Sequence, residues 1–230
     1  MKTMQKVAFV MLFAVVALIG LNGTSHADLE MKIWDSEGDT PLLLTDSGTG
    51  LIVKIGGSLG SWTFAQNVAV GSPVVGSPSQ PQFDLNFDVI DGNVGSSQWL
   101  KIAVSETGFT TGPGITKVVS LAAGGTLGSG SVTVQDFLDP TNTIFGGITG
   151  LAISVLGPYT GSAWSSGANG FFVGGTYSLT VLYTLTSNES GVRSGGDVDI
   201  LVNPVPLPGA LLLFAPGMLV LVRARRKLTK

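Results

Sequence analysis

Residues 177–186, with the sequence YSLTVLYTLT, carry the clearest structural signal in the chain. One set of alternate positions is apolar and consists of Tyr177, Leu179, Val181, Tyr183 and Leu185. The other set is polar except for Leu182. Alternation with a period of two places the two sets on opposite faces of a β-strand. The segment therefore predicts a strand with one apolar face.

Weaker forms of this alternation recur on both sides of that segment. They lie at 29–33, 51–55, 83–89, 100–104, 115–121, 131–135, 148–155 and 198–202. Glycine-containing pairs or triplets separate many of them, at 56–57, 91–92, 112–114, 124–125 and 195–196. Glycine at such points is typical of turns, so we expect about nine or ten short strands joined by turns.

The composition agrees with a β-rich chain. The 230 residues include 33 Gly but only 12 Lys and Arg and 15 Asp and Glu, which disfavours long amphipathic helices. Short strands without crossover helices predict an all-β fold, an antiparallel β-sandwich of the jelly-roll-like or immunoglobulin-like kind. The segment 71–81 contains three Pro and no alternation, so we expect a surface loop or linker inside one domain at 28–203.

The N-terminal segment 1–27 has the features of a secretory signal peptide. Lys2 and Lys6 precede an apolar run at 7–19, and Ser25-His26-Ala27 ends the segment with small residues at the two positions that signal peptidase reads. We predict cleavage between Ala27 and Asp28. The alternative is an uncleaved anchor helix, although the apolar run is short for a bilayer.

The C-terminal segment 204–230 has three parts in order. Pro206-Leu207-Pro208-Gly209-Ala210 opens an apolar stretch at 207–222, and a basic tail follows at 223–230 that includes Arg223, Arg225, Arg226 and Lys227. As a transmembrane helix, 16 residues would span about 24 Å, which is marginal for a bilayer. The basic tail would lie in the cytoplasm, with the domain outside. The alternative is a buried C-terminal strand or helix with a solvated basic end.

These three parts resemble the PEP-CTERM sorting signal, and 205–210 is similar to its VPLPA-type variant. The resemblance implies processing by exosortase, a membrane-embedded enzyme of Gram-negative bacteria that make exopolysaccharide. The stretches 85–87, 100–109 and 139–146 also resemble ectodomains that carry this signal. The implied location is the cell envelope or extracellular matrix, after transient anchoring of the C-terminal helix in the inner membrane.

The mature domain is strongly acidic. Within 28–203 the cations are Lys32, Lys54, Lys101, Lys117 and Arg193, against all 15 acidic residues, a formal charge of −10. The whole chain carries −3 because the other basic residues lie in the two terminal segments. A surface of this charge argues against nucleic acid or anionic lipid as a partner.

The residue types exclude several kinds of catalysis. The chain has no Cys, and its one His, His26, lies in the predicted signal peptide, so Ser-His-Asp and Cys-His catalysis and His-ligated zinc are excluded for the mature domain. A glycoside hydrolase would need two facing carboxyl groups. The glutamates are Glu30, Glu37, Glu106 and Glu189, and nothing in the sequence pairs them. We therefore expect no catalytic residues and no enzyme activity.

Calcium is the one cofactor that the sequence leaves open. Asp84, Asn86 and Asp88 have the spacing of a calcium loop, but Val89 and Gly95 stand where an EF-hand needs Gly and Glu. The same alternation also makes these three residues the solvent-facing side of a strand, which is the favoured interpretation. Asp136, Asp139 and Asn142 form a second group with the same two interpretations.

Aromatic residues are the candidates for stacking on sugar rings. They are Trp62, Trp99, Trp164 and Tyr159, of which Tyr159 and Trp164 lie in a stretch that looks too polar for a strand. Such residues also serve as core or interface residues. The leading hypothesis is an exported, non-enzymatic surface protein that meets signal peptidase and exosortase, contacts the membrane through its C-terminal helix, and has extracellular polysaccharide as a candidate partner. The alternatives are a carbohydrate- or calcium-binding adhesin module and, last, a carboxylate-based glycoside hydrolase.

Overall fold

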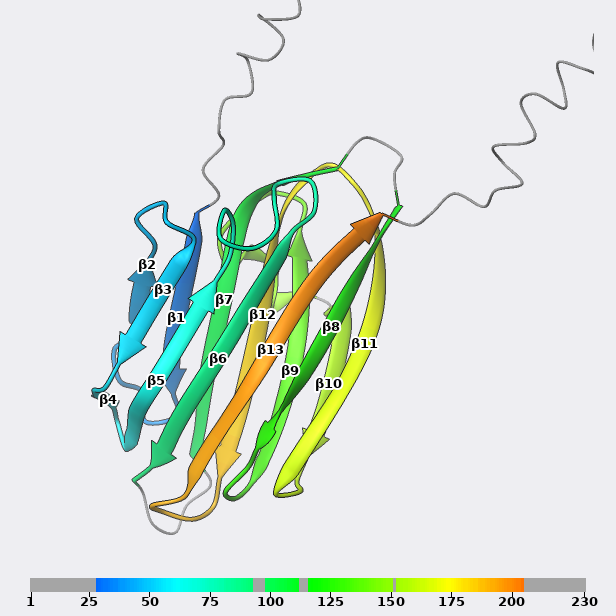
Figure 1. Cartoon of the computed structure of the whole chain (residues 1–230). Helices are drawn as coiled ribbons and strands as arrows, with labels where there is room; N and C mark the ends of the chain where they lie inside the picture. The colour runs from blue at the N-terminus through cyan, green and yellow to red at the C-terminus, as the bar shows by residue number, and fades with distance from the viewer. Residues whose placement is uncertain (1–27, 93–97, 112–115, 151, 205–230) are drawn as a thin grey trace, which may run out of the picture.

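Two antiparallel β-sheets pack face to face in the computed structural model, which describes residues 28–92, 98–111, 116–150 and 152–204 (Figure 1). The elements in chain order are β1 (Leu29–Asp35), β2 (Leu42–Thr45), β3 (Leu51–Ile55), β4 (Ser58–Leu59), β5 (Trp62–Val70), β6 (Gln82–Asp91), β7 (Gln98–Thr110), β8 (Thr116–Thr126), β9 (Ser131–Asp139), the 3-10 helix η1 (Gly146–Thr149), β10 (Ser154–Tyr159), β11 (Ala163–Val173), β12 (Thr176–Ser187) and β13 (Arg193–Pro204). The predicted all-β sandwich is confirmed at this level.

Each sheet is built from strands that lie far apart in the sequence. Sheet A has the order β10-β9-β12-β7-β1-β2, and sheet B has the order β11-β8-β13-β6-β5-β3, with β4 pairing to β5. The chain crosses between the sheets at most of its connections after β6. β1 begins and β13 ends at the same end of the sandwich (Figure 1).

The core lies between the sheets and is filled by the apolar positions of the alternating strands. On β12, the five apolar positions from Tyr177 to Leu185 are each at most 2% exposed. Phe83, Leu85, Phe87 and Val89 of β6 face them from sheet B and are equally buried. The rings of Phe87 and Tyr183 meet with centroids 4.2 Å apart. Two inner faces that interdigitate in this way are what stabilises a β-sandwich.

The second face of β12 is also covered in part, which explains Leu182. The segment after β9, which includes η1, lies on the outer face of sheet A. Phe145 and Ile148 from this segment pack against Leu182. Ser178 Oγ donates to the carbonyl of Thr143 at 2.8 Å. Leu182 therefore interrupts the alternation because a small second core exists there.

Several sequence-based expectations about elements were wrong. The described part of the segment 148–155 is a strand only from Ser154, where β10 begins, because glycine-rich 146–149 forms η1. The predicted turns at 124–125 and 195–196 lie inside β8 and β13, where Gly125 and Gly196 face each other across the pair. Strands β2, β5 and β11 were missed because their alternation is short, bulged or composed of small polar residues.

The Pro-rich segment 71–81 is a loop between the neighbouring strands β5 and β6, as expected. Hydrogen bonds hold it on the sandwich: the Thr110 N–H donates to the Pro78 carbonyl at 2.9 Å, and Lys117 Nζ donates to the Ser79 carbonyl at 2.6 Å. It therefore divides no domain. Within the described ranges, the structure contains no helix whose length and hydropathy would suit a bilayer crossing.

Candidate functional site

The predicted targeting residues fall mostly outside the described residues. Asp28 is described, and its N–H donates to Thr107 Oγ1 at 3.3 Å. Ala27, the sorting motif Pro206, Leu207, Pro208, Gly209 and Ala210, and the basic residues Arg223, Arg225, Arg226 and Lys227 lie outside the described ranges. Their roles stay predictions.

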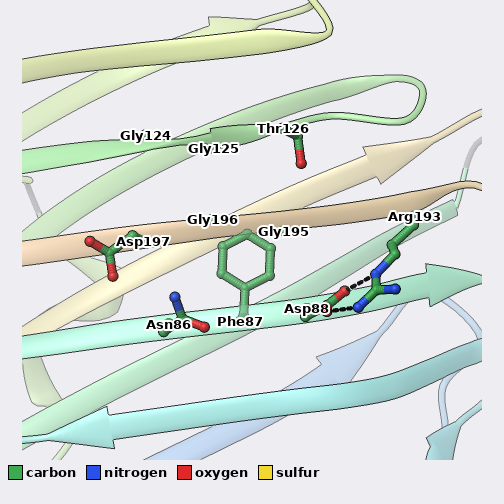
Figure 2. A pocket seen from close by; sticks show the side chains of 10 residues that line it. All are labelled: Asn86, Phe87, Asp88, Gly124, Gly125, Thr126, Arg193, Gly195, Gly196 and Asp197. Atoms are coloured by element: carbon green, nitrogen blue, oxygen red, sulfur yellow. Dashed lines mark hydrogen bonds and ion pairs between the residues drawn. The ribbon is translucent and has the colours of Figure 1, made fainter.

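The first calcium candidate lies on the solvent-facing side of a strand, as the favoured interpretation had it. Asp84, Asn86 and Asp88 all lie on the outer face of β6, so they form no loop around a central point. Asp88 forms a two-pronged ion pair with Arg193 of β13, in which Nε lies 2.7 Å from Oδ1 and a second contact joins Nη2 to Oδ2 (Figure 2). Burial and the neighbouring Asp197 and Asp199 raise the pKa of Asp84 to about 7.

A shallow groove of about 570 Å³ runs beside this ion pair on the outer face of sheet B. Its floor is backbone, because Gly124 and Gly125 of β8 and Gly195 and Gly196 of β13 bring no side chains (Figure 2). The glycine at 196 is required by packing, since a Cβ there would lie 2.7 Å from a ring atom of Phe87. The groove is open, and besides the ion pair the polar side chains of Asn86, Thr126 and Asp197 line it.

The side-chain oxygens of the second calcium candidate accept hydrogen bonds from backbone N–H groups of the protein. Asp139 accepts from the N–H groups of Thr141 at 2.9 Å and Thr143 at 3.1 Å. Burial raises the pKa of Asp139, but these hydrogen bonds outweigh it and hold the pKa below the usual value. Asn142 Oδ1 accepts from the Gly108 N–H at 2.8 Å. Asp136 is buried and accepts from the Ser154 N–H at 2.6 Å, and burial raises its pKa to about 6. This pattern is typical of residues that hold turns and strand ends.

The four glutamates lie in four different surroundings. Glu30 is on the outer face of β1, Glu37 is in the exposed turn after β1, and Glu189 is in the turn after β12. Glu106 points into the sandwich and is fully buried. Burial raises its pKa to about 8, partly offset by the Ser72 N–H, which donates to Oε1 at 2.9 Å. Its side chain is shielded from solvent.

Three of the four aromatic residues that were predicted to stack on sugars pack within the fold instead. Trp62 is a core residue, 1% exposed. Tyr159 and Trp164 do not lie in an irregular segment: they end β10 and begin β11, and their rings stack with centroids 5.4 Å apart. Trp164 is 8% exposed because its ring is turned inward toward Tyr183. Trp99 alone among the four lies on an outer sheet face.

Trp99 belongs to an aromatic–lysine patch that was not predicted from the sequence. The patch consists of Lys32 and Trp34 on β1 and Trp99 and Lys101 on β7, on the outer face of sheet A. Trp34 is half-buried and packs against the same small core as Phe145 and Ile148. Trp34 is the direct cross-strand partner of Lys101. Lys32 Nζ lies 5.2 Å from the Trp34 ring, and Lys101 Nζ lies 4.8 Å from the Trp99 ring. Within each pair the Lys and the Trp are two residues apart, which places them on the same face of a strand. This spacing could have predicted the patch from the sequence.

Hydrogen bonds and strand pairing hold the backbone of the patch in place. The Ser36 N–H donates to the Trp99 carbonyl at 3.0 Å, and the Trp99 N–H donates to Ser36 Oγ at 3.2 Å, which joins the end of β1 to the start of β7. On the other side, Thr184 and Thr186 of β12 pair with Lys101 and Trp99 and add hydroxyl groups to the same face. Paired strands thus position both tryptophans.

No protein-family model matches the chain, and no curated protein does. Among solved structures, the adhesin domain of Epf from Streptococcus pyogenes is similar, with 7% identity over 78% of this chain and 60% of that one, and a TM-score of 0.40. Tailspike protein 4 of bacteriophage CBA120 is 11% identical over 68% of this chain and 20% of that one, with a TM-score of 0.34. The C-terminal CBM6 of LamC from Zobellia galactanivorans is 15% identical over 50% of this chain and 78% of that one, with a TM-score of 0.26.

This chain therefore spans a fifth of the tailspike chain and less than two thirds of the Epf chain. Likenesses at this level carry no conclusion about ligand or activity.

Proposed function

We propose that the chain is an exported, non-enzymatic surface protein whose sandwich binds extracellular polysaccharide through the aromatic–lysine patch. The observation that carries the binding proposal is the pair of Trp–Lys contacts on neighbouring strands of the outer face of sheet A, where all four side chains are half-buried. Tryptophan offers an apolar face for a sugar ring, and lysine donates hydrogen bonds to hydroxyl or carboxylate groups. Each ammonium lies within the range of a cation–π contact, so the ring and the charge are held together before a ligand binds.

The distribution of cations supports this choice of surface. In a domain of formal charge −10, the patch holds two of the five cations. Arg193 is paired with Asp88, and Lys117 is 5% exposed and donates to the backbone of the loop after β5. Lys54 lies apart on β3 of the other sheet. A ligand that needs ammonium donors beside aromatic faces therefore finds both at the patch.

We infer that the sandwich is of the jelly-roll kind and not immunoglobulin-like. From β6 onward, sheet B has the order β6-β13-β8-β11 and sheet A has the order β7-β12-β9-β10. This is the order of an eight-stranded jelly roll, in which two interleaved Greek keys share the two sheets. β1 and β2 extend one sheet beside β7, and β5 and β3 extend the other beside β6.

Export and sorting by exosortase remain part of the proposal on the strength of the two terminal segments. Signal peptidase would cleave between Ala27 and Asp28, and exosortase would act on the segment from Pro206. An acidic domain suits this location, because it would stay soluble outside the membrane. We propose no catalytic residue. We thus propose both functions for one protein: the terminal segments direct export and sorting, and the domain binds carbohydrate.

The binding experiment uses the full-length chain and exopolysaccharide isolated from the strain that produces it. The parent should be retarded in a native gel that contains the polysaccharide. Trp34→Ala and Trp99→Ala should each weaken binding about five- to tenfold, since a lost aromatic contact of about 1–1.5 kcal/mol has that effect. Lys101→Ala should weaken it less.

The matched control is Lys54→Ala, which removes a lysine from the other sheet and should leave binding unchanged. Thermal unfolding of every variant checks that the fold is intact. If the two tryptophan variants fold and bind like the parent, the patch is not the binding surface. If the parent is not retarded at all, the binding proposal fails.

A further inference from the structure

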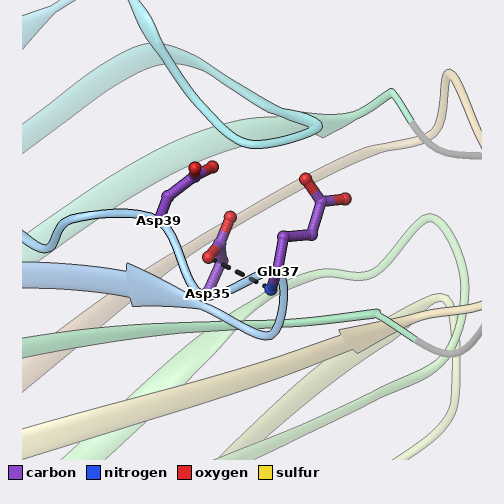
Figure 3. Close-up of side chains that lie close together, drawn as sticks. All are labelled: Asp35, Glu37 and Asp39. Atoms are coloured by element: carbon purple, nitrogen blue, oxygen red, sulfur yellow. Dashed lines mark hydrogen bonds between the residues drawn. The ribbon is translucent and has the colours of Figure 1, made fainter.

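The turn that follows β1 brings three carboxylates together. Asp35, Glu37 and Asp39 occupy alternate positions, and one oxygen of each lies within 4.8 Å of the others. Figure 3 shows the three side chains on the same side of the turn. Like charges this close repel one another unless something positive lies between them. A cluster on an exposed turn is not a site by itself, so the surroundings of each oxygen matter.

Asp35 provides an independent observation. It is the last residue of β1, it points toward the core, and it is 4% exposed. Its Oδ1 accepts from the Glu37 N–H at 3.2 Å, but its Oδ2 is buried without any hydrogen-bond partner. A buried carboxylate oxygen that lacks a partner is costly, so its presence points to a ligand.

Gly60, in the turn between β4 and β5, marks the place to which the three oxygens point. A Cβ on Gly60 would lie 2.5 Å from Glu37 Oε2, 3.0 Å from Asp39 Oδ2 and closer still to Asp35 Oδ2. Only a residue without a side chain leaves this space open. Three carboxylate oxygens from the end of β1 thus converge beside Gly60 of the β4–β5 turn.

We propose that Asp35, Glu37 and Asp39 bind a calcium ion in the space beside Gly60. Carboxylate oxygens are the ligands that hard cations prefer, and calcium takes six to eight of them in flexible geometry. Glu37 and Asp39 are exposed, so water can complete the coordination. Magnesium demands a stricter octahedral arrangement and is the weaker candidate. This site is distinct from both groups that the sequence suggested.

The ion would join the two sheets at one end of the sandwich. The Ser61 N–H at the start of β5 already donates to Glu37 Oε2 at 3.1 Å, so the turn after β1 contacts the β4–β5 turn without the ion. The site also adjoins the aromatic–lysine patch, since Trp34 precedes Asp35 in the chain. Calcium should therefore stabilise this end of the fold, whether or not the patch binds polysaccharide.

The test titrates calcium chloride into the chelator-treated full-length chain and follows the melting temperature. Terbium is the second probe, because Trp34 and Trp62 lie next to the site in the chain and can sensitise its luminescence. Half-saturation with calcium is expected at about 10⁻⁴–10⁻³ M, the range of extracellular modules. Asp39→Asn should raise this concentration at least about tenfold. Asp35→Asn should raise the half-saturating calcium concentration as well. Because Asp35 is buried, this variant could fail to fold, and the exposed Asp39 then provides the test.

The matched control is Asp84→Asn, which makes the same change in the acidic group on sheet B and should leave the titration unchanged. Without calcium, Asp39→Asn should melt no lower than the parent, because it removes repulsion; with calcium, the parent should melt higher. The proposal is overturned if the parent shows neither a calcium-dependent shift nor terbium luminescence. It is equally overturned if Asp39→Asn titrates like the parent, or if magnesium chloride at the same concentration gives an equal shift.

Discussion

Glu106 is an acidic residue that is fully buried between the two sheets. Its side chain points between the sheets from β7, where the Ser72 N–H is its donor at 2.9 Å and Oε2 has no partner. Gly71 provides the room, because a Cβ there would lie 2.5 Å from Oε2. Burial is the main reason why its pKa rises to about 8, and nearby Asp46 adds to the effect. At neutral pH, the folded protein therefore holds this group mostly as the neutral acid.

A pH dependence of stability follows from Glu106. The folded state keeps a proton that the unfolded chain releases between its ordinary pKa of 4.5 and the folded value of about 8. The free energy of unfolding therefore falls as the pH rises through this window, and the contribution is constant below it. Glu106→Gln should make the free energy of unfolding less dependent on pH between about 5 and 8.

Urea unfolding of the parent and of Glu106→Gln at several pH values measures this. Asp136 and Asp84, whose pKa values rise to about 6 and about 7, leave a residual slope of the same sign. The control is Glu30→Gln on the outer face of the neighbouring strand, which should keep the slope of the parent. Equal slopes for the parent and Glu106→Gln would contradict the assignment.

At the scale of elements, paired glycines let strands β8 and β13 approach closely. Gly125 and Gly196 are cross-strand partners one pair in from the end of the ladder, not turn residues. A Cβ on Gly125 would lie 2.7 Å from Gly196 Cα and closer still to the Gly195 carbonyl oxygen. These contacts are with backbone, which cannot turn aside as a side chain can. The sequence shows the glycines but not the neighbour that requires them.

Gly125→Ala should therefore destabilise the fold by about 1–3 kcal/mol, the usual cost of overpacking. The matched control is Gly175→Ala between β11 and β12, where a Cβ would meet nothing within 4 Å. Chemical denaturation of both variants measures the difference. A Gly125→Ala variant as stable as Gly175→Ala would show that β8 and β13 are not paired in this register.

At the scale of the whole molecule, the start of β1 and the end of β13 lie at the opposite end of the sandwich from the proposed sites (Figure 1). β1 begins and β13 ends at one end (Figure 1). Trp34 and Asp35 are the last residues of β1, and Trp99 is the second residue of β7, so the patch and the carboxylate cluster lie toward the other end. A protein tethered through its C-terminal segment would hold both sites away from the membrane.

The proposed sorting signal at 204–230 can be tested in the full-length chain. Proline lacks an N–H donor and favours an extended backbone before it, which is the form in which a protease can bind a strand-like substrate. Replacing Pro206 and Pro208 with Ala should block processing and leave membrane insertion intact. Replacing Arg223, Arg225, Arg226 and Lys227 with Gln should instead impair retention in the membrane, because the cationic end sets topology.

The experiment expresses the parent and both variants in a host with and without its exosortase and follows the product on a gel. The parent should lose about the mass of its tail only where exosortase is present, and the proline variant should keep its full size. If the parent migrates identically in both hosts, the C-terminal segment is not a sorting signal.

Local sequence patterns identified many of the strands, but not how those strands meet. Alternation in 177–186 is a property of neighbouring residues, so it predicted β12 and the all-β class, and composition predicted the acidic domain. Alternation does not say which face is inward: β3 buries Ile52 and leaves Val53, on its other face, 49% exposed. Glycine within a strand and glycine in a turn look alike until the partner strand is present.

The sites depended on tertiary structure for the same reason. Trp34 and Lys101 are neighbours only because β1 pairs with β7 in one register. Asp35 meets the space at Gly60 only because the two sheets pack face to face, and that packing also buries its Oδ2. Register and packing are set by the free energy of the whole core, which no short stretch of sequence contains.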